Sequence, residues 1–154
     1  MPEIRVTIGG AELKRALADP MVVAGPVRDF LYQSAFTVEA KAKLKAPVDT
    51  GRLRSSIASQ VNETQAIIGS NVAYAPYVEF GTRPHWPPQG ALQPWAQRHG
   101  FPAGKAGDFL VRRAISRRGT RAHPYLIPAL RESVEEIRGF LTEMGEAIKR
   151  RFGS

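Results

Sequence analysis

The sequence P-V-R-D-F-L-Y-Q-S-A-F-T-V-E-A-K-A-K-L-K (residues 26–45) sets the architecture of this protein. Its apolar and small residues recur at helical spacing, whereas charged residues and glutamine occupy the other side. Proline is favoured in the first helical turn and Pro47 cannot continue a helix, so the pattern predicts an amphipathic helix over about 26–45. The face predicted to be buried consists of Val27, Phe30, Leu31, Ser34, Ala35, Val38 and Ala42.

Short strand patterns lie on both sides of that helix. Residues 4–8 alternate apolar and polar side chains and stop at Gly9-Gly10, which indicates a strand with one apolar face. Residues 58–69 predict two strands joined by a turn at Asn62-Glu63-Thr64. Together these segments predict a small antiparallel sheet.

Further helices are predicted elsewhere in the chain. Residues 11–18 consist of strong helix formers, and Leu53 and Ile57, four residues apart, favour one short helical turn. A final helix is predicted over about 128–151. Its apolar stripe consists of Leu130, Val134, Ile137, Leu141, Met144 and Ile148. The predicted fold is therefore α+β: a small antiparallel sheet packed against a long amphipathic helix and a C-terminal helix.

The segment over about 83–107 changes character, because it is rich in proline and glycine and is typical of a loop. A short helical piece over 91–99 interrupts it. Residues 109–121 are apolar and basic together and fit a strand or a short helix with one positive side. We expect one domain over 1–154, with 83–107 as an arm that contacts a neighbour.

Composition narrows the function classes. The 154 residues carry a formal net charge of +8 and an isoelectric point of about 10.3, which keeps the chain near polyanions: nucleic acid or an acidic partner surface. Cysteine is absent, which excludes disulfides and thiolate metal sites. No apolar run approaches the roughly 20 residues of a membrane span. The N-terminus lacks the pattern of a secretory signal, so we expect no export and no membrane contact.

The triplet Asp49-Thr50-Gly51 raises the question of a peptidase, because Asp-Thr-Gly surrounds the reactive carboxylate of aspartic proteases. Those enzymes pair two carboxylates that share a proton. Here Arg52 and Arg54 follow the triplet, and both would keep the carboxylate ionised. The simpler interpretation is a corner, in which Asp49 or Thr50 accepts backbone N–H bonds and Gly51 takes a conformation closed to other residues.

Other candidates for chemistry are weak. Glu79 lies among aromatic and apolar residues, and we expect it to be half-buried and paired with an arginine such as Arg52, Arg54 or Arg83, either within a subunit or across a contact. The three histidines stand alone, without metal-ligand spacing, and no nucleophile elbow, P-loop or dinucleotide fingerprint is present. We therefore predict no enzyme activity, no catalytic residue, no metal and no cofactor.

Basic pairs and tryptophans mark the candidate contact surface: Trp86, Trp95, Arg112, Arg113, Arg117 and Arg118. One interpretation is phosphate contact by the arginines and stacking of bases on the tryptophans, as in a small basic nucleic-acid-binding module. The other is docking on a protein neighbour, with the tryptophans as apolar anchors. The residues favour protein contact, and DNA binding stays open as the alternative function.

The order of the sequence blocks resembles one family. A-P-V-D-T-G-R-L-R-S-S-I (46–57) follows the amphipathic helix, then come the strand pair, A-Y-A-P-Y-V-E-F-G-T (73–82) and A-H-P-Y-L-I-P-A-L (122–130). Over roughly 26–150 this arrangement resembles the minor tail component family of long-tailed double-stranded DNA phages, also called tail-completion or neck proteins. The residues that match its motifs are Asp49, Thr50, Gly51, Leu53, Ile57, Tyr74, Tyr77, Glu79, Phe80, Gly81, Thr82, Pro124 and Leu126.

The resemblance implies an α+β virion protein at the head–tail junction, acting in a ring that completes the tail or joins it to the capsid. Its implied partners are other copies of itself, the tail tube and head–tail connector proteins, with contact to packaged DNA left open. Its implied location is the virion neck or tail, and the host cytoplasm before assembly. In this interpretation Tyr74, Tyr77 and Phe80 pack the domain, and a Glu79→Ala change abolishes tail attachment more than it unfolds the monomer.

Overall fold

The structure is a computed structural model that describes residues 4–9 and 20–152. Its chain divides into two units. We call residues 1–79 together with 124–154 the main unit. Residues 80–123 form the inserted unit, which lies between the two segments of the main unit in sequence.

The main unit contains a three-stranded antiparallel sheet. Its strands are β1 (Ile4–Gly9), β2 (Ile57–Val61) and β3 (Gln65–Ser70), and β3 pairs with the other two from the middle of the sheet. The strand predicted over 4–8 and the strand pair predicted over 58–69 are confirmed. Both β1 and β2 are edge strands, each paired on one side among the described strands.

The turn between β2 and β3 is held by one asparagine side chain. Asn62 Oδ1 accepts the backbone N–H groups of Thr64 and Gln65, both at 3.0 Å. Asparagine favours turns because its short side chain can replace a backbone acceptor in this way. The turn predicted at residues 62–64 is confirmed.

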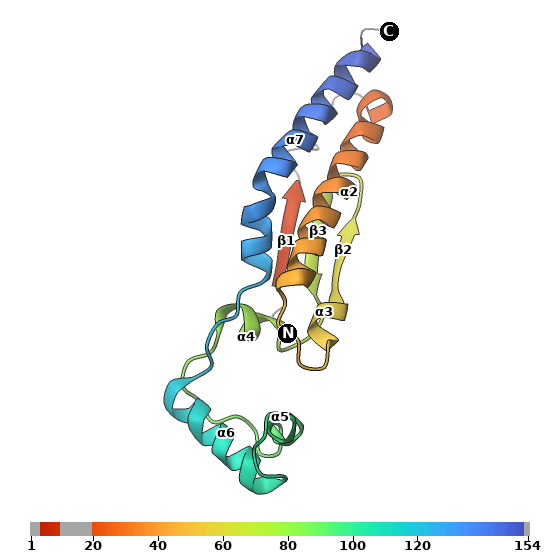
Figure 1. Cartoon of the computed structure of the whole chain (residues 1–154). Coiled ribbons are helices and arrows are strands. Elements are labelled where there is room, and N and C mark those ends of the chain that lie inside the picture. The colour runs from red at the N-terminus through yellow and green to blue at the C-terminus, as the bar shows by residue number, and fades with distance from the viewer. Residues whose placement is uncertain (1–3, 10–19, 153–154) are drawn as a thin grey trace. The chain divides into compact units, whose positions relative to one another are not determined.

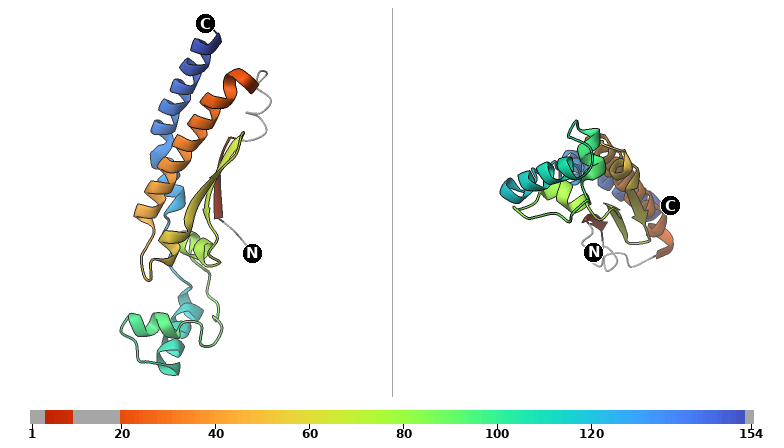
Figure 2. Two further views of the ribbon diagram at one scale, coloured as in Figure 1. Left: turned by 90° about the vertical axis from the view of Figure 1, so that its right-hand side faces the viewer. Right: turned by 90° about the horizontal axis from the view of Figure 1, so that it is seen from below.

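Two helices form the layers that cover the sheet. α2 (Pro20–Lys45) lies between the sheet and α7 (Leu126–Phe152), and the two helices run antiparallel (Figures 1 and 2). Alternate residues of the strands, such as Ile57 and Ile68, are buried in this core. The architecture is the predicted α+β class.

α2 has the buried face that the sequence predicts, because Val27, Leu31, Ala35 and the other four residues of that face are all buried. Its start was predicted wrongly. The helix begins at Pro20, so Pro26 lies inside it and not in its first turn. An internal proline removes a backbone hydrogen bond, and burial of Val23 and Val27 on either side offsets that cost. The helix predicted over 11–18 lies outside the described residues.

α7 begins and ends close to the predicted bounds, but two positions of its buried stripe differ from the prediction. In both cases the residue one position earlier faces the core. Val134 and Leu141 are 37 % and 49 % exposed, whereas Ser133 is fully buried and Phe140 packs against the core. Ser133 can be buried because its Oγ donates to the carbonyl of Ala129 at 2.8 Å. The predicted members Leu130, Ile137, Met144 and Ile148 do pack against the core.

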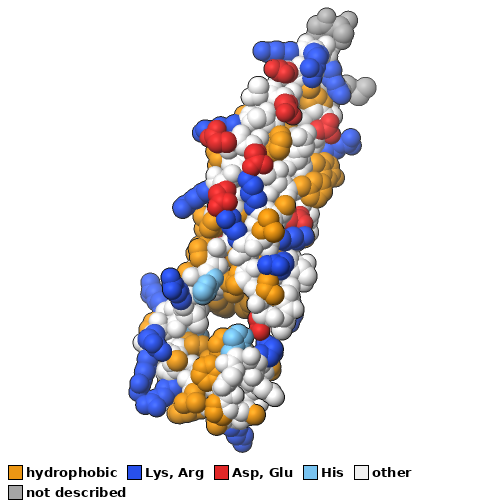
Figure 3. Space-filling model, in the orientation of Figure 1, with side chains coloured by type: hydrophobic (Ala, Val, Ile, Leu, Met, Phe, Trp, Pro, Cys, Tyr) orange, Lys and Arg blue, Asp and Glu red, His pale blue; other side chains and the backbone are white. Residues whose placement is uncertain are grey.

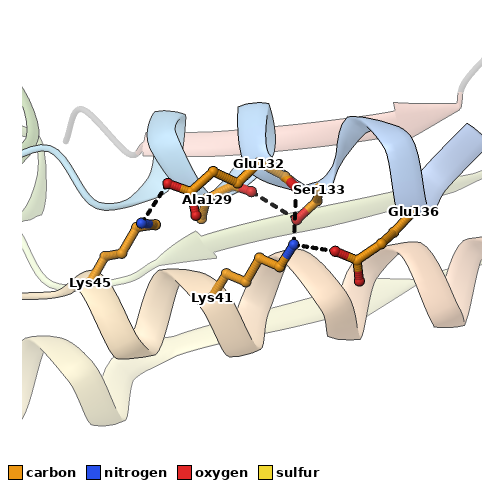
Figure 4. A network of polar contacts seen from close by, with 6 residues as sticks. All are labelled: Lys41, Lys45, Ala129, Glu132, Ser133 and Glu136. Carbon is orange, nitrogen blue, oxygen red and sulfur yellow. Dashed lines mark hydrogen bonds and ion pairs between the residues drawn. The ribbon is translucent and has the colours of Figure 1, made fainter.

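Ion pairs along the surface fix the register of the two long helices (Figure 4). Lys41 of α2 pairs with Glu136 of α7 and donates to the carbonyl oxygen of Glu132 at 3.0 Å. Lys45, one turn further along α2, pairs with the Glu132 carboxylate at 2.7 Å. Such exposed pairs contribute up to about 1 kcal/mol each, so apolar burial remains the main stabilising term.

The inserted unit contains two helices, α5 (Gln93–Arg98) and α6 (Lys105–Arg118). The helical piece predicted over 91–99 is confirmed. Residues 109–121, which fit a strand or a short helix in the sequence, are helical over most of their length. The single domain expected over 1–154 remains a prediction.

Two leucines of α2 offer a matched test of this packing. Leu31→Ala should lower the free energy of unfolding by about 2–5 kcal/mol, because Leu31 is fully buried and its loss leaves a cavity. Leu44→Ala, the same change on the same helix, should alter it by less than about 0.5 kcal/mol, because Leu44 is 80 % exposed. Urea unfolding followed by circular dichroism measures both, and equal losses would contradict the described packing.

Candidate functional site

The Asp49-Thr50-Gly51 corner joins α2 to the sheet. Gly51 has φ of 80° and precedes α3 (Arg52–Ser56), the predicted short helical turn, so the expected glycine conformation is confirmed. Thr50 Oγ1 accepts the N–H of Arg52 only at a long 3.4 Å. Asp49 and Thr50 are exposed. Gly51 thus supplies the backbone conformation that turns the chain at this motif.

Burial of two apolar residues anchors this corner. Leu53 of α3 and Ile57 of β2 are both buried in the core of the main unit. The Ser55 N–H donates to the Gly51 carbonyl at 2.9 Å and closes the helical turn. The matched motif residues Gly51, Leu53 and Ile57 thus have a structural explanation in this chain.

A shallow groove of about 170 Å³ lies on the face of the sheet that points away from α2. Ala58, Gln60, Ile67 and Gly69 line it, together with Arg5, Ser56, Ser70 and Asn71. No carboxylate is among these lining residues, and Asp49 lies outside the groove.

Glu79 is the most deeply buried carboxylate among the described residues of the main unit, with 2 % exposure. It lies on α4 (Ala75–Phe80) and reaches the start of α7, which is 46 to 48 residues away in sequence. Its Oε2 accepts the backbone N–H groups of Tyr125 at 2.7 Å and Leu126 at 2.9 Å, and its Oε1 accepts that of Ile127 at 2.9 Å. Among the described residues no arginine pairs with it, so the expected arginine pairing within the chain is wrong.

Helix geometry explains why a carboxylate suits this position. The first N–H groups of a helix have no partner within the helix, and the helix dipole favours negative charge there. At the start of α7, Pro128 has no N–H, and Ala129 donates to the Tyr125 carbonyl at 3.3 Å. Glu79 accepts the remaining donors, so one side chain satisfies the helix end that would otherwise be buried without partners.

Tyr125 lies beside this carboxylate and is 1 % exposed. Its hydroxyl has no hydrogen-bond partner among the described residues. Burial, then the negative charge of Glu79 and the neighbouring Tyr74, raise the pKa of Tyr125 to about 12. Tyr125 was not among the predicted site residues, although the sequence places it between Pro124 and an apolar run.

The aromatic residues of the second motif do not pack the domain, contrary to expectation. Tyr74, Tyr77 and Phe80 are all exposed, while Ala75 and Glu79 occupy the buried face of α4. Spacing of three residues places the aromatic side chains on the other side of this short helix. They are therefore exposed side chains and not a part of the core.

Gly81 sits where the inserted unit closes on itself. It has φ of 70°, and a Cβ there would meet the Thr120 carbonyl oxygen at 2.5 Å and the Ala122 nitrogen at 2.8 Å. Beside it, Thr82 and Thr120 form an antiparallel bridge and share a hydroxyl hydrogen bond of 2.9 Å. Only glycine fits this close approach of two chain segments.

Arg112 and Asp108 hold the inserted unit together. Asp108 is 2 % exposed, and its carboxylate accepts the N–H groups of Gly90 at 3.0 Å and Leu92 at 3.1 Å. Arg112 lies 3.6 Å from Asp108 and donates through Nε to the Pro87 carbonyl at 2.8 Å. Asp108 was not among the predicted site residues, although it is the only carboxylate of residues 80–123.

The other predicted contact residues are exposed. Trp86 is 56 % exposed, lies under the Arg112 guanidinium at 5.5 Å, and has Phe109 at a ring distance of 6.3 Å. Trp95 is 36 % exposed and stacks on His99 at 4.0 Å. Arg113, Arg117 and Arg118 project from α6 into solvent. A role of these residues in partner contact remains a prediction.

Two properties of the described part of the chain bear on other functions. Over residues 4–9 and 20–152, no cluster of three or more histidine, aspartate or glutamate side chains could hold a metal ion. None of the described helices is long and apolar enough to cross a membrane. The expectation of no cofactor remains a prediction.

Removal of the Glu79 charge tests the helix cap. Glu79→Gln should lower the free energy of unfolding by about 2–3 kcal/mol, because charged hydrogen bonds to buried N–H groups are lost. Burial thus makes unfolding, and not a selective loss of tail attachment, the expected result of changes at Glu79. Glu136→Gln, an exposed acid on α7, should cost at most about 1 kcal/mol. Thermal unfolding of both variants compares them, and a neutral Glu79→Gln would refute the cap.

Tyr125 should make the free energy of unfolding fall as the pH rises in the alkaline range. Since its pKa rises on folding from 10.0 to about 12, its contribution is complete below pH 10 and is lost as pH rises toward 12. Tyr125→Phe should abolish this component, and it should be neutral or slightly stabilising at pH 7 because the lost hydroxyl is buried without a partner. Urea midpoints at several pH values measure the difference, and parallel pH curves for the two proteins would contradict it.

Comparison with known proteins now bears on the same residues. Residues 11–81 match the model of a family described as "Bacteriophage HK97-gp10, putative tail-component". No curated protein and no solved structure matches the chain significantly. The matched stretch includes both motifs up to Gly81, so it covers less than the expected 26–150. Residues 82–123 of the inserted unit and all of α7 lie outside it. Residues 11–81 are therefore similar to a family of putative bacteriophage tail components.

Proposed function

We propose that this protein is a structural component of the head–tail junction of a long-tailed phage, where several copies form a ring that completes the tail or joins it to the capsid. The observation that carries the proposal is the match of residues 11–81 to a phage tail-component family. In this role the protein acts by assembly and performs no chemical reaction.

The main unit offers edges through which copies could join. β1 and β2 are short edge strands of a three-stranded sheet, and an unpaired strand edge can add a strand from another chain. A closed ring removes such edges, since each copy covers the next. Exposed Tyr32 and Phe36 of α2, whose rings stack at 5.9 Å, add apolar area for such a contact.

The inserted unit offers a second contact surface, for the tail tube or a connector protein. Its buried apolar residues are few, chiefly Ala96 and Val111, whereas Trp86, Phe109 and Leu110 are exposed. A unit of this size buries little apolar area alone and would gain stability by docking on a partner. Aromatic side chains and arginines are the residue types enriched in protein interfaces.

Complementation in a phage tests the proposal. A phage that lacks the gene should release filled heads and tails that are not joined, and the wild-type protein supplied in trans should restore joined particles. Electron micrographs and plaque titres measure this. Normal particles without the protein would overturn the proposed function.

The aromatic contact has its own test in the same assay. A Trp86→Ala/Phe109→Ala double variant should lower the titre at least about 30-fold, the equilibrium factor for the ~2 kcal/mol loss of a contact hot spot. Leu44→Ala, an exposed leucine of the main unit, serves as the control and should restore full titre. Circular dichroism must show the double variant folded, and a folded double variant with wild-type titre would remove Trp86 and Phe109 from the contact.

A further inference from the structure

The positive charge of this protein is concentrated in the inserted unit. Residues 80–123 contain eight of the 22 lysines and arginines but one of the 14 acidic residues, which gives them a formal charge of +7. The whole chain carries +8, so the main unit is nearly neutral. A general need for solubility does not explain this separation, because it would be met by charge anywhere on the surface.

The surface of the inserted unit carries no carboxylate at all, since its single acid is Asp108. That side chain is buried, accepts hydrogen bonds from two backbone N–H groups and forms an ion pair with Arg112. In the main unit, by contrast, Lys41, Lys43 and Lys45 each pair with a glutamate. Lys105, Arg113, Arg117 and Arg118 therefore have no exposed carboxylate near them on the chain segment 80–123.

These cations follow α6 and the residues around it. Arg113 and Arg117 are four residues apart on α6, Arg118 and Arg121 follow, and blue side chains gather along this helix in Figure 3. Within the described residues, Lys105, Arg113, Arg117 and Arg118 form no ion pair. Like charges four residues apart destabilise a helix slightly, so α6 would gain from an external polyanion.

A structural explanation covers only a part of this pattern. Cations in the last turn of a helix interact favourably with its dipole, which accounts for Arg117 and Arg118. It does not account for Arg113 in the middle of α6, for Lys105 at its start, or for Arg83 and Arg121 outside it. The excess charge thus requires another cause.

We infer that α6 and its flanking arginines bind the phosphate backbone of double-stranded DNA without sequence preference. Arg113 and Arg117 lie about 6 Å apart along the helix axis, close to two phosphate steps of about 3.4 Å on one strand. Residues 80–123 contain seven arginines and one lysine, and the planar guanidinium of arginine suits phosphate oxygens. A protein partner would need a surface with acidic side chains and almost no basic ones to complement this charge. The proposed place at the neck, through which the genome passes, would supply the DNA, and this last point alone rests on the proposed function.

Binding of the full-length protein to a labelled duplex of about 30 base pairs, followed by fluorescence anisotropy between about 50 and 200 mM salt, tests the inference. Affinity should be equal for two unrelated sequences. The logarithm of the association constant should fall with the logarithm of salt with a slope of about −3 to −5, as expected when four to five phosphates are neutralised. No binding at about 50 mM salt would overturn the inference.

A matched pair of triple variants locates the site. Arg113→Gln/Arg117→Gln/Arg118→Gln should weaken binding at least about 10-fold and reduce the steepness of the salt slope by about 2 to 3. Arg131→Gln/Lys149→Gln/Arg150→Gln removes the same charge from exposed positions on α7 and should leave binding nearly unchanged. Equal losses from both variants would mean that net charge alone acts, and would refute a site on α6.

A polyglutamate peptide of the same charge as the duplex distinguishes DNA from an acidic protein partner. The duplex should bind more tightly, and an affinity for the peptide that equals or exceeds it would replace DNA with an acidic protein surface. These measurements use no phage. A chain that fails to bind DNA but restores joined particles would refute this inference alone, and the reverse outcome would refute only the head–tail role.

Discussion

The carboxylate of Glu79 joins parts of the main unit that are far apart in sequence. It accepts three backbone N–H groups at the start of α7, and so replaces the partners that the first turn of a helix always lacks. Because residues 80–123 leave the main unit directly after Glu79 and return just before Tyr125, this contact also holds the two ends of the inserted segment together. The long α2–α7 pair, whose apolar faces form most of the core, can then align with a fixed starting point for α7.

The two units are stabilised in different ways. In the main unit the central helix α2 contacts the sheet on one side and α7 on the other, so apolar burial dominates. In the inserted unit a buried aspartate, an arginine and close glycine contacts organise a segment with little apolar core. A segment of that kind leaves its aromatic and basic side chains exposed, which suits a contact surface better than a scaffold.

The family match and the physical separation of the units agree at one point of the chain. The matched residues end at Gly81, one residue after the inserted unit begins at Phe80. Gly81 is also the position where a side chain would collide with the returning segment near Thr120. The tail-component resemblance thus concerns mainly the first part of the main unit. The basic segment that follows lies outside the matched residues.

Local sequence was enough to predict most elements of this protein. The 3.6-residue period of residues 26–45, the alternation in the strands, the Asn62 turn and the Gly51 corner depend on neighbours in the chain, and the structure confirms them. Periodicity does not distinguish adjacent helix positions. Val134 and Leu141 were therefore predicted to lie in the buried stripe of α7, where the structure has Ser133 and Phe140.

Only the tertiary structure decided what the buried polar groups do. Glu79 was expected to pair with an arginine, because arginines are near in sequence, yet its partners are 46 to 48 residues away. Asp108 and Tyr125 had no sequence pattern that revealed their burial. The physical reason is that backbone N–H groups are donors at every residue except proline, so the sequence cannot show which of them a folded chain leaves without a partner.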